Sequence, residues 1–292
     1  MNTLFCFGLG YSAQLAAKRL AAEGWQIIGT STTPAGVQSI EKAGYRGLHF
    51  DGASLSPDVS PALKEATHIL LSIPPGADGD PAYVHHAEDI AASPSVRWIG
   101  YFSTVGVYGD TGGGWVDEDT PAVPASERGQ RRLAAENAWR KLGRDTGKAV
   151  NILRLPGIYG PGRSAIEDVL AGTARSIIKP GQVFNRIHVE DIASATIAAA
   201  KRAAPDRVYN ITDDEPCAPQ DVVTHAAKLL GAPPPPELDF ATANLSPMAR
   251  SFYSESKRVR NGRMKAELLP RLAYPTYREG LAAIAAASKK GG

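Results

Sequence analysis

Short apolar runs alternate with amphipathic segments along the first half of the chain. The apolar runs end in glycine, proline or polar residues and predict buried strands at 4–7, 25–30, 48–51, 67–73, 97–104 and 149–155. The segments between them carry apolar residues at helical spacing and predict helices at 11–23, 36–43, 61–66, 83–92 and 127–144. Strands that are apolar throughout and alternate with helices are typical of a parallel sheet covered on both faces.

A glycine-rich turn joins the first predicted strand to the first predicted helix. Gly8, Gly10 and Ala13 form the pattern G-x-G-x-x-A. The first glycine permits a tight turn, the second lets the backbone approach a pyrophosphate, and the small third residue lets helix and strand pack closely. Tyr11 and Ser12 stand in the first turn of the helix, where free N–H groups and the positive dipole end favour phosphates. We therefore predict a dinucleotide site, against the alternative of a purely structural turn.

The end of the second strand decides between the two nicotinamide dinucleotides. An Asp or Glu at this point binds the ribose 2′-hydroxyl of NAD, but the segment 29–36 contains no acid. Ser31, Thr32 and Thr33 can donate hydrogen bonds to a 2′-phosphate, which favours NADP over NAD. The same hydroxyl groups suit the N-cap of the following helix, so both interpretations stay open.

The strand and helix pattern together with the glycine turn predicts two domains. We expect an α/β fold with a doubly wound parallel Rossmann sheet as an NAD(P)-binding domain over residues 1–155. After Pro156 the alternation breaks and proline becomes more frequent, so we expect a small C-terminal α/β substrate domain over residues 156–292. The segment 191–212 reads as a helix followed by a strand and is expected to return to the Rossmann sheet.

Further motifs follow the glycine turn in a fixed order. They are "HFDG" at 49–52, "FSTVGVYGD" at 102–110, "LRLPGIYGPG" at 153–162, "IHVEDIA" at 187–193 and "YPTYREGL" at 274–281. In this order they resemble the landmarks of the extended short-chain dehydrogenase/reductases, the NAD-dependent epimerase/dehydratase family. The resemblance covers nearly the whole chain.

The resemblance implies roles for individual residues. Thr104 falls where the family's catalytic Ser or Thr hydrogen-bonds a substrate oxygen, and Asp51 falls at the acid that contacts adenine. The resemblance also implies cofactor contacts at the end of the fourth strand and beside the nicotinamide, by Ser72, Ile73, Pro74, Pro156 and Gly157.

The resemblance breaks at the family's catalytic pair. The family carries Y-x-x-x-K on the helix after the fifth strand, whereas this chain has "RGQRRLAAE" at 128–136, in which Gly129, Leu133 and Glu136 hold the register. Arg128 then takes the tyrosine position and Arg132 the lysine position. Arginine stays protonated, so Arg128 cannot replace a phenol that transfers a proton, although Arg132 can bond the cofactor ribose as a cation. The resemblance thus implies an atypical member of the family with an altered active site.

Other side chains are candidates for the missing chemistry. Tyr108 and Tyr159 offer displaced phenols, with packing as the alternative role for each. The family often places an arginine for the sugar-nucleotide diphosphate at the position that Phe184 occupies here. Asn185 and Arg186 follow, and both are candidates to line a substrate pocket. Arg186 can bind an anion through paired N–H groups, with a surface salt bridge as its alternative role.

Composition narrows the class of partners. The 292 residues carry a net charge of +2, which gives no sign of a nucleic-acid groove. No apolar run is long enough to cross a bilayer, and "MNTLFCFGLG" leaves no room for a signal sequence. Cys6 and Cys217 lack metal-ligand spacing, so no metal is expected. We therefore expect a cytoplasmic monomer or homodimer without membrane or nucleic-acid partners.

Two functions are consistent with these observations. The first is an oxidoreductase or epimerase-like enzyme that uses NADP or NAD on a small-molecule substrate. The guanidinium groups of Arg128 and Arg132 favour an anionic substrate. The second is an NADP-binding sensor or regulatory protein without turnover.

Overall fold

The computed structural model describes residues 1–289, and the backbone contacts divide the chain into two compact units. Unit 1 comprises residues 1–107, 126–154 and 192–209, and unit 2 comprises 108–125, 155–191 and the chain from 210 onward. The predicted first domain, residues 1–155, includes the segment 108–125, whereas the structure places this segment in unit 2. Its partners explain this, because β6 (Trp115–Val116) pairs with β13 (Arg258–Val259) and the Thr111 N–H donates to the Ser256 carbonyl at 3.1 Å.

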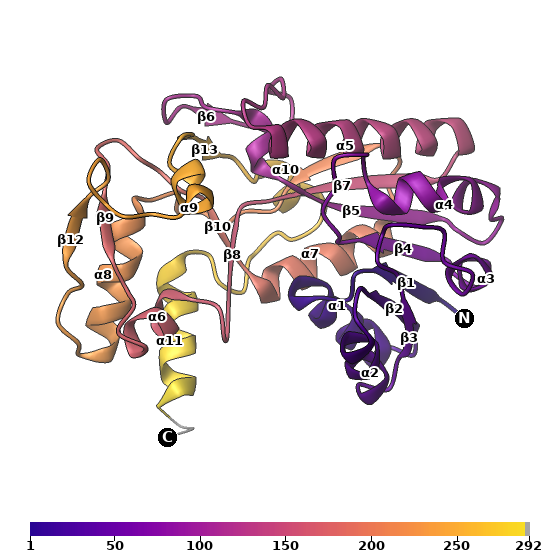
Figure 1. Ribbon diagram of the computed structural model, residues 1–292, viewed down its shortest axis with the longest axis horizontal. Helices are drawn as coiled ribbons and strands as arrows, with labels where there is room; N and C mark the ends of the chain where they lie inside the picture. Colours follow the sequence, from indigo (N-terminus) through magenta and orange to yellow (C-terminus); the bar gives the residue numbers. More distant parts are fainter. Residues whose placement is uncertain (290–292) are drawn as a thin grey trace. The chain divides into compact units, whose positions relative to one another are not determined.

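Unit 1 is built on a seven-stranded sheet in the order β11-β7-β5-β4-β1-β2-β3. Its strands are β1 (Thr3–Phe7), β2 (Gln26–Ser31), β3 (Arg46–His49), β4 (His68–Leu71), β5 (Trp98–Thr104), β7 (Ala149–Leu155) and β11 (Arg207–Asn210). The chain runs outward in one direction from β1 through β2 to β3 and in the other from β4 through β5 to β7 (Figure 1). The predicted doubly wound Rossmann sheet is confirmed, and its order reverses between β1 and β4, where such sheets bind ligands.

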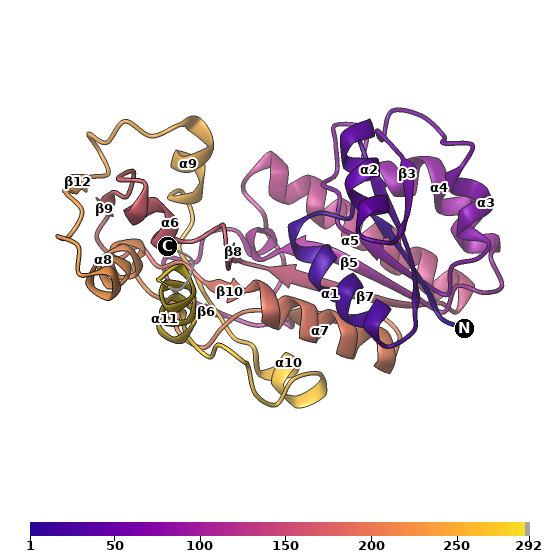
Figure 2. The same cartoon turned by 90° about the horizontal axis from the view of Figure 1, so that it is seen from below.

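Helices cover both faces of this sheet. Figures 1 and 2 show α4 (Pro81–Ala92) and α5 (Glu127–Thr146) on one face and α1 (Tyr11–Ala22) and α7 (Val189–Arg202) on the other. The last two helices are tied by a 2.8 Å hydrogen bond from Arg19 to the Ser194 hydroxyl. The short helix α3 (Val59–Leu63) lies next to α4, and α2 (Pro34–Lys42) packs on β2 and β3.

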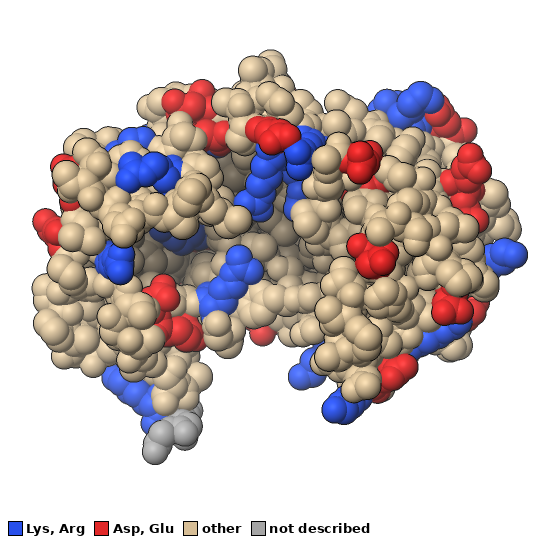
Figure 3. All heavy atoms as spheres, in the orientation of Figure 1, with Lys and Arg blue, Asp and Glu red and all other residues tan. Residues whose placement is uncertain are grey.

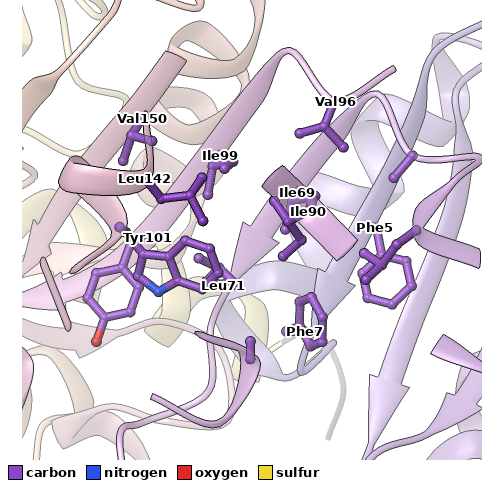
Figure 4. Close-up of a cluster of buried hydrophobic side chains, with 14 of the residues drawn as sticks. Phe5, Phe7, Ile69, Leu71, Ile90, Val96, Ile99, Tyr101, Leu142 and Val150 are labelled. Carbon is purple, nitrogen blue, oxygen red and sulfur yellow. The ribbon is translucent and has the colours of Figure 1, made fainter. Parts of the chain in front are cut away.

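The core of unit 1 follows from the alternation of side chains along its strands. The parallel register pairs Phe5 with Ile69 and Ile69 with Ile99, and it pairs Phe7 with Leu71 and Leu71 with Tyr101, so these side chains share one face. Figure 4 shows them beside Ile90 of α4 and Leu142 of α5. All are nearly inaccessible to solvent. Burial of each side chain contributes about 1.5–3 kcal/mol to the folding free energy. This packing holds in place the strand ends that carry the candidate site.

Unit 2 combines short strand pairs with helices. β8 (Gly157–Tyr159) pairs in parallel with β10 (Arg186–His188), and β9 (Ser176–Ile178) pairs with β12 (Glu237–Asp239). The helices α6 (Ala165–Leu170), α8 (Pro219–Leu230) and α11 (Tyr277–Ser288) pack on one another around an apolar cluster. The short helices α9 (Pro247–Phe252) and α10 (Gly262–Glu267) complete unit 2. The 3-10 helix η1 (Val105–Tyr108) follows β5 where the chain passes from unit 1 to unit 2. Unit 2 is thus a mixed α/β unit.

Candidate functional site

The glycine turn lies at the carboxyl end of β1. Gly8 has φ +81°, a left-handed conformation that favours glycine. Its N–H donates to the Thr30 hydroxyl at 2.9 Å, and its carbonyl accepts a 2.7 Å bond from the Ser72 hydroxyl. A side chain at Gly8 would place its Cβ 2.6 Å from a methyl carbon of Ile73. The ends of β1, β2 and β4 are thus tied together, and Ser72 and Ile73 lie against the turn.

Gly10 is the open position of the turn. It is the N-cap of α1 with extended backbone, and no side chain caps the helix at this point. A Cβ built on Gly10 would meet no atom within 4 Å. Ala13, one turn further, is fully buried. Tyr11 and Ser12 stand in the first turn between them, so helix N–H groups and an unfilled cradle coincide where the strand order reverses.

The polar residues after β2 divide into two roles. Thr33 caps α2, because its hydroxyl accepts a 3.1 Å bond from the Gly36 N–H. Ser31 packs against this cap and accepts a 3.3 Å bond from the Thr33 N–H. Thr32 is exposed, and its carbonyl lies 3.1 Å from His49 Nε2. The N-cap interpretation therefore holds for Thr33, while the Ser31 and Thr32 hydroxyl groups keep their donor hydrogens for a ligand.

Thr104 ends β5 on the same sheet edge as the glycine turn. β5 and β1 flank β4, so the two strand ends lie roughly 10 Å apart at the usual strand spacing. The Thr104 hydroxyl accepts a 3.1 Å bond from the Gly106 N–H. Its own hydrogen remains available to a substrate oxygen.

A buried charged network lies directly behind Thr104. The Ser103 hydroxyl donates to Glu136 at 2.5 Å, and Arg154 grips the same carboxylate through two bonds of 3.0 and 2.7 Å. Glu136 and Arg154 are 1% and 5% exposed. Sequence reasoning gave Glu136 only as a register mark and missed Arg154. A glutamate on the buried face of a helix and an arginine inside the apolar run Leu153–Leu155 were the signals for such a pair.

The two arginines that the sequence motif aligns with the catalytic pair, an alignment that stays a prediction, differ in environment. Arg132 is 9% exposed and binds the Phe102 carbonyl, with its guanidinium 5.9 Å from the Tyr101 ring centre. Arg128, one turn earlier, is exposed at the start of α5. Partial desolvation and then the Arg132 charge lower the pKa of Arg128. Arg132 therefore fastens the helix to β5, and Arg128 is the cation on the accessible side.

The two displaced phenols both use their hydrogens within unit 2. Tyr108 is 3% exposed and donates to the Asn210 side chain at 2.9 Å. Tyr159 is buried and donates to the Thr276 carbonyl at 3.2 Å. Burial, and then the nearby Asp213, raise the pKa of Tyr159. Neither hydroxyl is placed as a ready proton donor.

Unit 2 contains a pocket of about 470 Å³ in which two of the expected substrate residues meet. Tyr159 and Arg186 both line it, together with residues of α6, α8 and α11. Asn185 does not line this pocket, because its amide is used on both sides: it donates to the Lys257 carbonyl at 3.0 Å and accepts from the Val259 N–H at 2.8 Å. Its role is to tie β10 to the segment before α10.

The remaining predicted residues lie at loop and strand ends. Asp51 follows β3, is exposed, and accepts a 2.8 Å bond from the Ala53 N–H. Pro74 follows β4, and Pro156 lies between β7 and β8. Gly157 pairs with Arg186, and its N–H donates to the Asn185 carbonyl at 3.2 Å. A Cβ at Gly157 would lie 3.2 Å from the same carbonyl oxygen, so a larger residue requires a local shift.

Two kinds of feature were not found within the described residues, a membrane-spanning helix and a cluster of metal-binding side chains. None of the helices in the 1–289 range is long and apolar enough to span a bilayer. Over the same range there is no group of three His, Cys, Asp or Glu side chains suited to a metal ion. On the face drawn in Figure 3, acidic side chains lie among the basic ones.

The fold and the glycine turn define a class first: unit 1 is a Rossmann domain with an open dinucleotide cradle at its switch point. A family model then places the chain more narrowly, since residues 89–212 match the NAD dependent epimerase/dehydratase family. The chain belongs to this family, as the sequence motifs had indicated.

Three relatives show the range of the similarity. Protein YeeZ of Escherichia coli K12 is 30% identical over 248 residues, which cover 80% of this chain and 86% of YeeZ. A 3-diazoavenalumate denitrifying reductase of a Streptomyces species is 27% identical over 77% of this chain and 79% of the reductase. The solved structure of a conserved protein of unknown function from Silicibacter pomeroyi DSS is 48% identical, with a TM-score of 0.89 over 99% of this chain and 100% of that one.

Proposed function

We propose that this protein is an NADP- or NAD-dependent reductase of the epimerase/dehydratase family, with a small-molecule substrate and an altered active site. The observation that carries the proposal is the shared sheet edge of the open Gly10 cradle and the Thr104 hydroxyl. The relative from Streptomyces, whose name is that of a reductase, supports this reaction class.

The cradle suits a dinucleotide in shape and charge. Gly10 presents backbone with no side chain in front of it, and the N-terminus of α1 directs its positive end to the same place. Ser72 and Ile73 complete the wall beside Gly8. Ser31 and Thr32 offer hydroxyl groups where the ribose of the adenosine half is held in this fold, which favours the 2′-phosphate of NADP. When bound, the reduced nicotinamide supplies a hydride.

The protein's own residues then have separate tasks. Thr104 donates its hydroxyl hydrogen to the substrate oxygen that gains negative charge, since it already accepts from Gly106. The Glu136–Arg154 pair holds this strand end in place through Ser103. Arg128 contributes a positive charge near the start of α5 but no proton. The proton that completes the reduction comes from water, because Tyr108 and Tyr159 donate within unit 2.

A turnover assay tests the proposal. NADPH oxidation is followed by absorbance with a panel of aldehydes, ketones and their carboxylated analogues. We expect Thr104→Val to lower kcat about 10²- to 10³-fold, as for loss of a donor to a developing oxyanion, while NADPH affinity is unchanged. Thr104→Ser, which keeps the hydroxyl, should retain most of the rate.

The alternative function makes a different prediction for the same assay. A sensor or regulatory protein binds NADPH tightly but does not oxidise it with any substrate of the panel. The inward orientation of Arg132 favours this alternative, because its guanidinium binds the Phe102 carbonyl and the residue is 9% exposed. Absence of turnover across the panel with intact NADPH binding would overturn the reductase proposal. Equal rates for Thr104→Val and wild type would overturn the role of Thr104.

A further inference from the structure

The pocket in unit 2 has the size and lining of a ligand site. Its volume of about 470 Å³ lies within the usual range for small-molecule pockets. One side is apolar and consists of Tyr159, Val222, Tyr277 and Leu281. These residues belong to the buried cluster between β8, α8 and α11, so the wall is held by the core of the unit. A ligand body that fits this wall is apolar or aromatic.

Two cations line this pocket, the exposed Arg163 and the half-buried Arg186. Arg186 is the one that reaches below the surface. Its guanidinium donates through one nitrogen, Nη1, to the Cys217 sulfur at 3.2 Å and weakly to the Phe184 carbonyl at 3.4 Å. Among residues 1–289 no carboxylate lies within ion-pair distance of Arg186, although guanidinium has five N–H donors in a planar fork. The fork therefore keeps donors for an anion that enters the pocket.

The acids near the pocket leave this charge in place. Glu167 is held by the Gly162 N–H at 2.7 Å and by the Ser164 hydroxyl. Asp213 is 1% exposed and does not line the pocket. Its burial raises its pKa to about 8 although Arg186 acts in the other direction, which weakens it as a counter-ion of the guanidinium.

The rim limits the total charge of the ligand. Arg163 and Asp168 both line the pocket and are both exposed, so one positive and one negative group face solvent at its opening. Together with the carboxylate of Glu167 they disfavour a ligand with several negative charges, such as a diphosphate. A ligand with a single carboxylate can bind the Arg186 guanidinium and carries no more than one negative charge past these acidic groups.

We propose that this pocket binds a small aromatic or apolar monocarboxylate, with the carboxylate on Arg186 and the body against Tyr159, Val222 and Tyr277. This class of ligand is also the substrate class that we propose for the reductase, and that identification rests on the proposed function. Binding to the pocket itself requires no turnover and is measured separately.

The test uses 4-fluorocinnamate as the probe, observed by fluorine NMR with the full-length protein. We expect the acid to bind and its neutral amide, 4-fluorocinnamamide, to bind at least about 10-fold more weakly. Arg186→Gln should weaken binding of the acid about 10- to 100-fold, as for loss of a charge-assisted hydrogen bond. Arg186→Lys, which keeps the charge and loses the fork, should lie between wild type and Arg186→Gln. The control is Arg175→Gln, an exposed arginine of the same unit that does not line the pocket.

A second variant guards against a folding defect at Arg186. Val223→Trp fills the pocket from its half-buried α8 position and should abolish binding of the acid. The proposal is overturned if wild type does not bind the acid, if the amide binds equally well, or if both variants bind like wild type. Displacement of the acid by millimolar inorganic phosphate would also overturn the carboxylate assignment.

NADPH titration of the same samples separates this proposal from the proposed function. Binding of the acid without any binding of NADPH would overturn the reductase and leave the pocket assignment intact. Binding of NADPH without the acid would do the reverse.

Discussion

Substitution of Gly10 by valine separates dinucleotide binding from folding. Gly10 has an extended, negative-φ backbone that any residue adopts, and a Cβ at this position meets no protein atom within 4 Å. The valine side chain therefore extends into the space in front of the helix N-terminus. This is the space that a pyrophosphate would occupy.

The expected magnitudes differ strongly between binding and stability. Each backbone N–H bond to a charged group is worth about 1.5–3 kcal/mol, so exclusion of a pyrophosphate from two of them costs roughly 3–6 kcal/mol, or about 10²- to 10⁴-fold in Kd. The loss in folding stability should stay near 1 kcal/mol, since glycine is only a moderately better N-cap than valine.

Two further glycines supply the controls. Gly262→Val places the same side chain at the start of α10, where a Cβ also meets nothing within 4 Å, and should leave both stability and NADPH affinity near wild type. Gly8→Val should instead destabilise unit 1, because φ is +81° and the new Cβ would lie 2.6 Å from Ile73. The left-handed backbone alone costs a residue with a Cβ about 1–2 kcal/mol.

Calorimetric titration with NADPH and NADH measures the affinity, and thermal unfolding measures the stability. An unchanged Kd for Gly10→Val would refute the assignment of this turn to the pyrophosphate. A collapse of its thermal stability to the level of Gly8→Val would refute the claim that the cradle is open.

Three further outcomes are expected. Wild type should bind NADP more tightly than NAD. Ser31→Asp should reverse this preference, because a carboxylate repels the 2′-phosphate of NADP and accepts a hydrogen bond from the 2′-hydroxyl of NAD. Paired titrations with the two cofactors check this, and tighter NAD binding by wild type would contradict it. The double variant Arg128→Tyr with Arg132→Lys places a tyrosine and a lysine at the two positions predicted for the family's pair. Any turnover with sugar nucleotides or simple carbonyl compounds should then rise toward the 10²–10⁴-fold that a positioned acid contributes. Circular dichroism reports whether loss of the bond from Arg132 to β5 unfolds the helix. Burial lowers the pKa of His68 and of His188 from 6.5 to about 4. Between these two pH values the unfolded chain binds more protons than the folded chain, so the free energy of unfolding falls as pH falls, by about 3 kcal/mol for each histidine once the pH is below 4. Urea unfolding at pH 7 and pH 5 measures this fall, and a stability that rises toward pH 5 would contradict it.

Local signals were sufficient for the Rossmann half of the fold. The strand 149–155 has the same bounds in the sequence pattern and in the structure, and the helix that follows the glycine turn begins at Tyr11 in both. Both elements carry their own pattern of apolar residues and their own end signals. The third strand was placed at 48–51 but spans 46–49, because Arg46 and Gly47 give no apolar signal at a sheet edge.

The segment 108–125 shows where local pattern is insufficient. No local signal in the sequence assigns it to unit 2, yet its partners there are Ser256 and β13, more than a hundred residues further along the chain. Its assignment to unit 2 depends on these long-range bonds.

The sequence by itself determined the order of strands and helices in the Rossmann half and the glycine turn, and it predicts arginines at the positions of the family's tyrosine and lysine. Each of these is a property of residues close together in the chain, because periodicity, turn chemistry and motif spacing are local.

Only the tertiary structure decided what the polar side chains do. It turned Arg132 inward to the Phe102 carbonyl, used the phenol of Tyr108 on Asn210, and left Arg186 facing a pocket without an ion-pair partner among residues 1–289. These outcomes depend on which distant segments pack together. A side chain becomes available for a ligand only where that packing leaves some of its donors or acceptors unused.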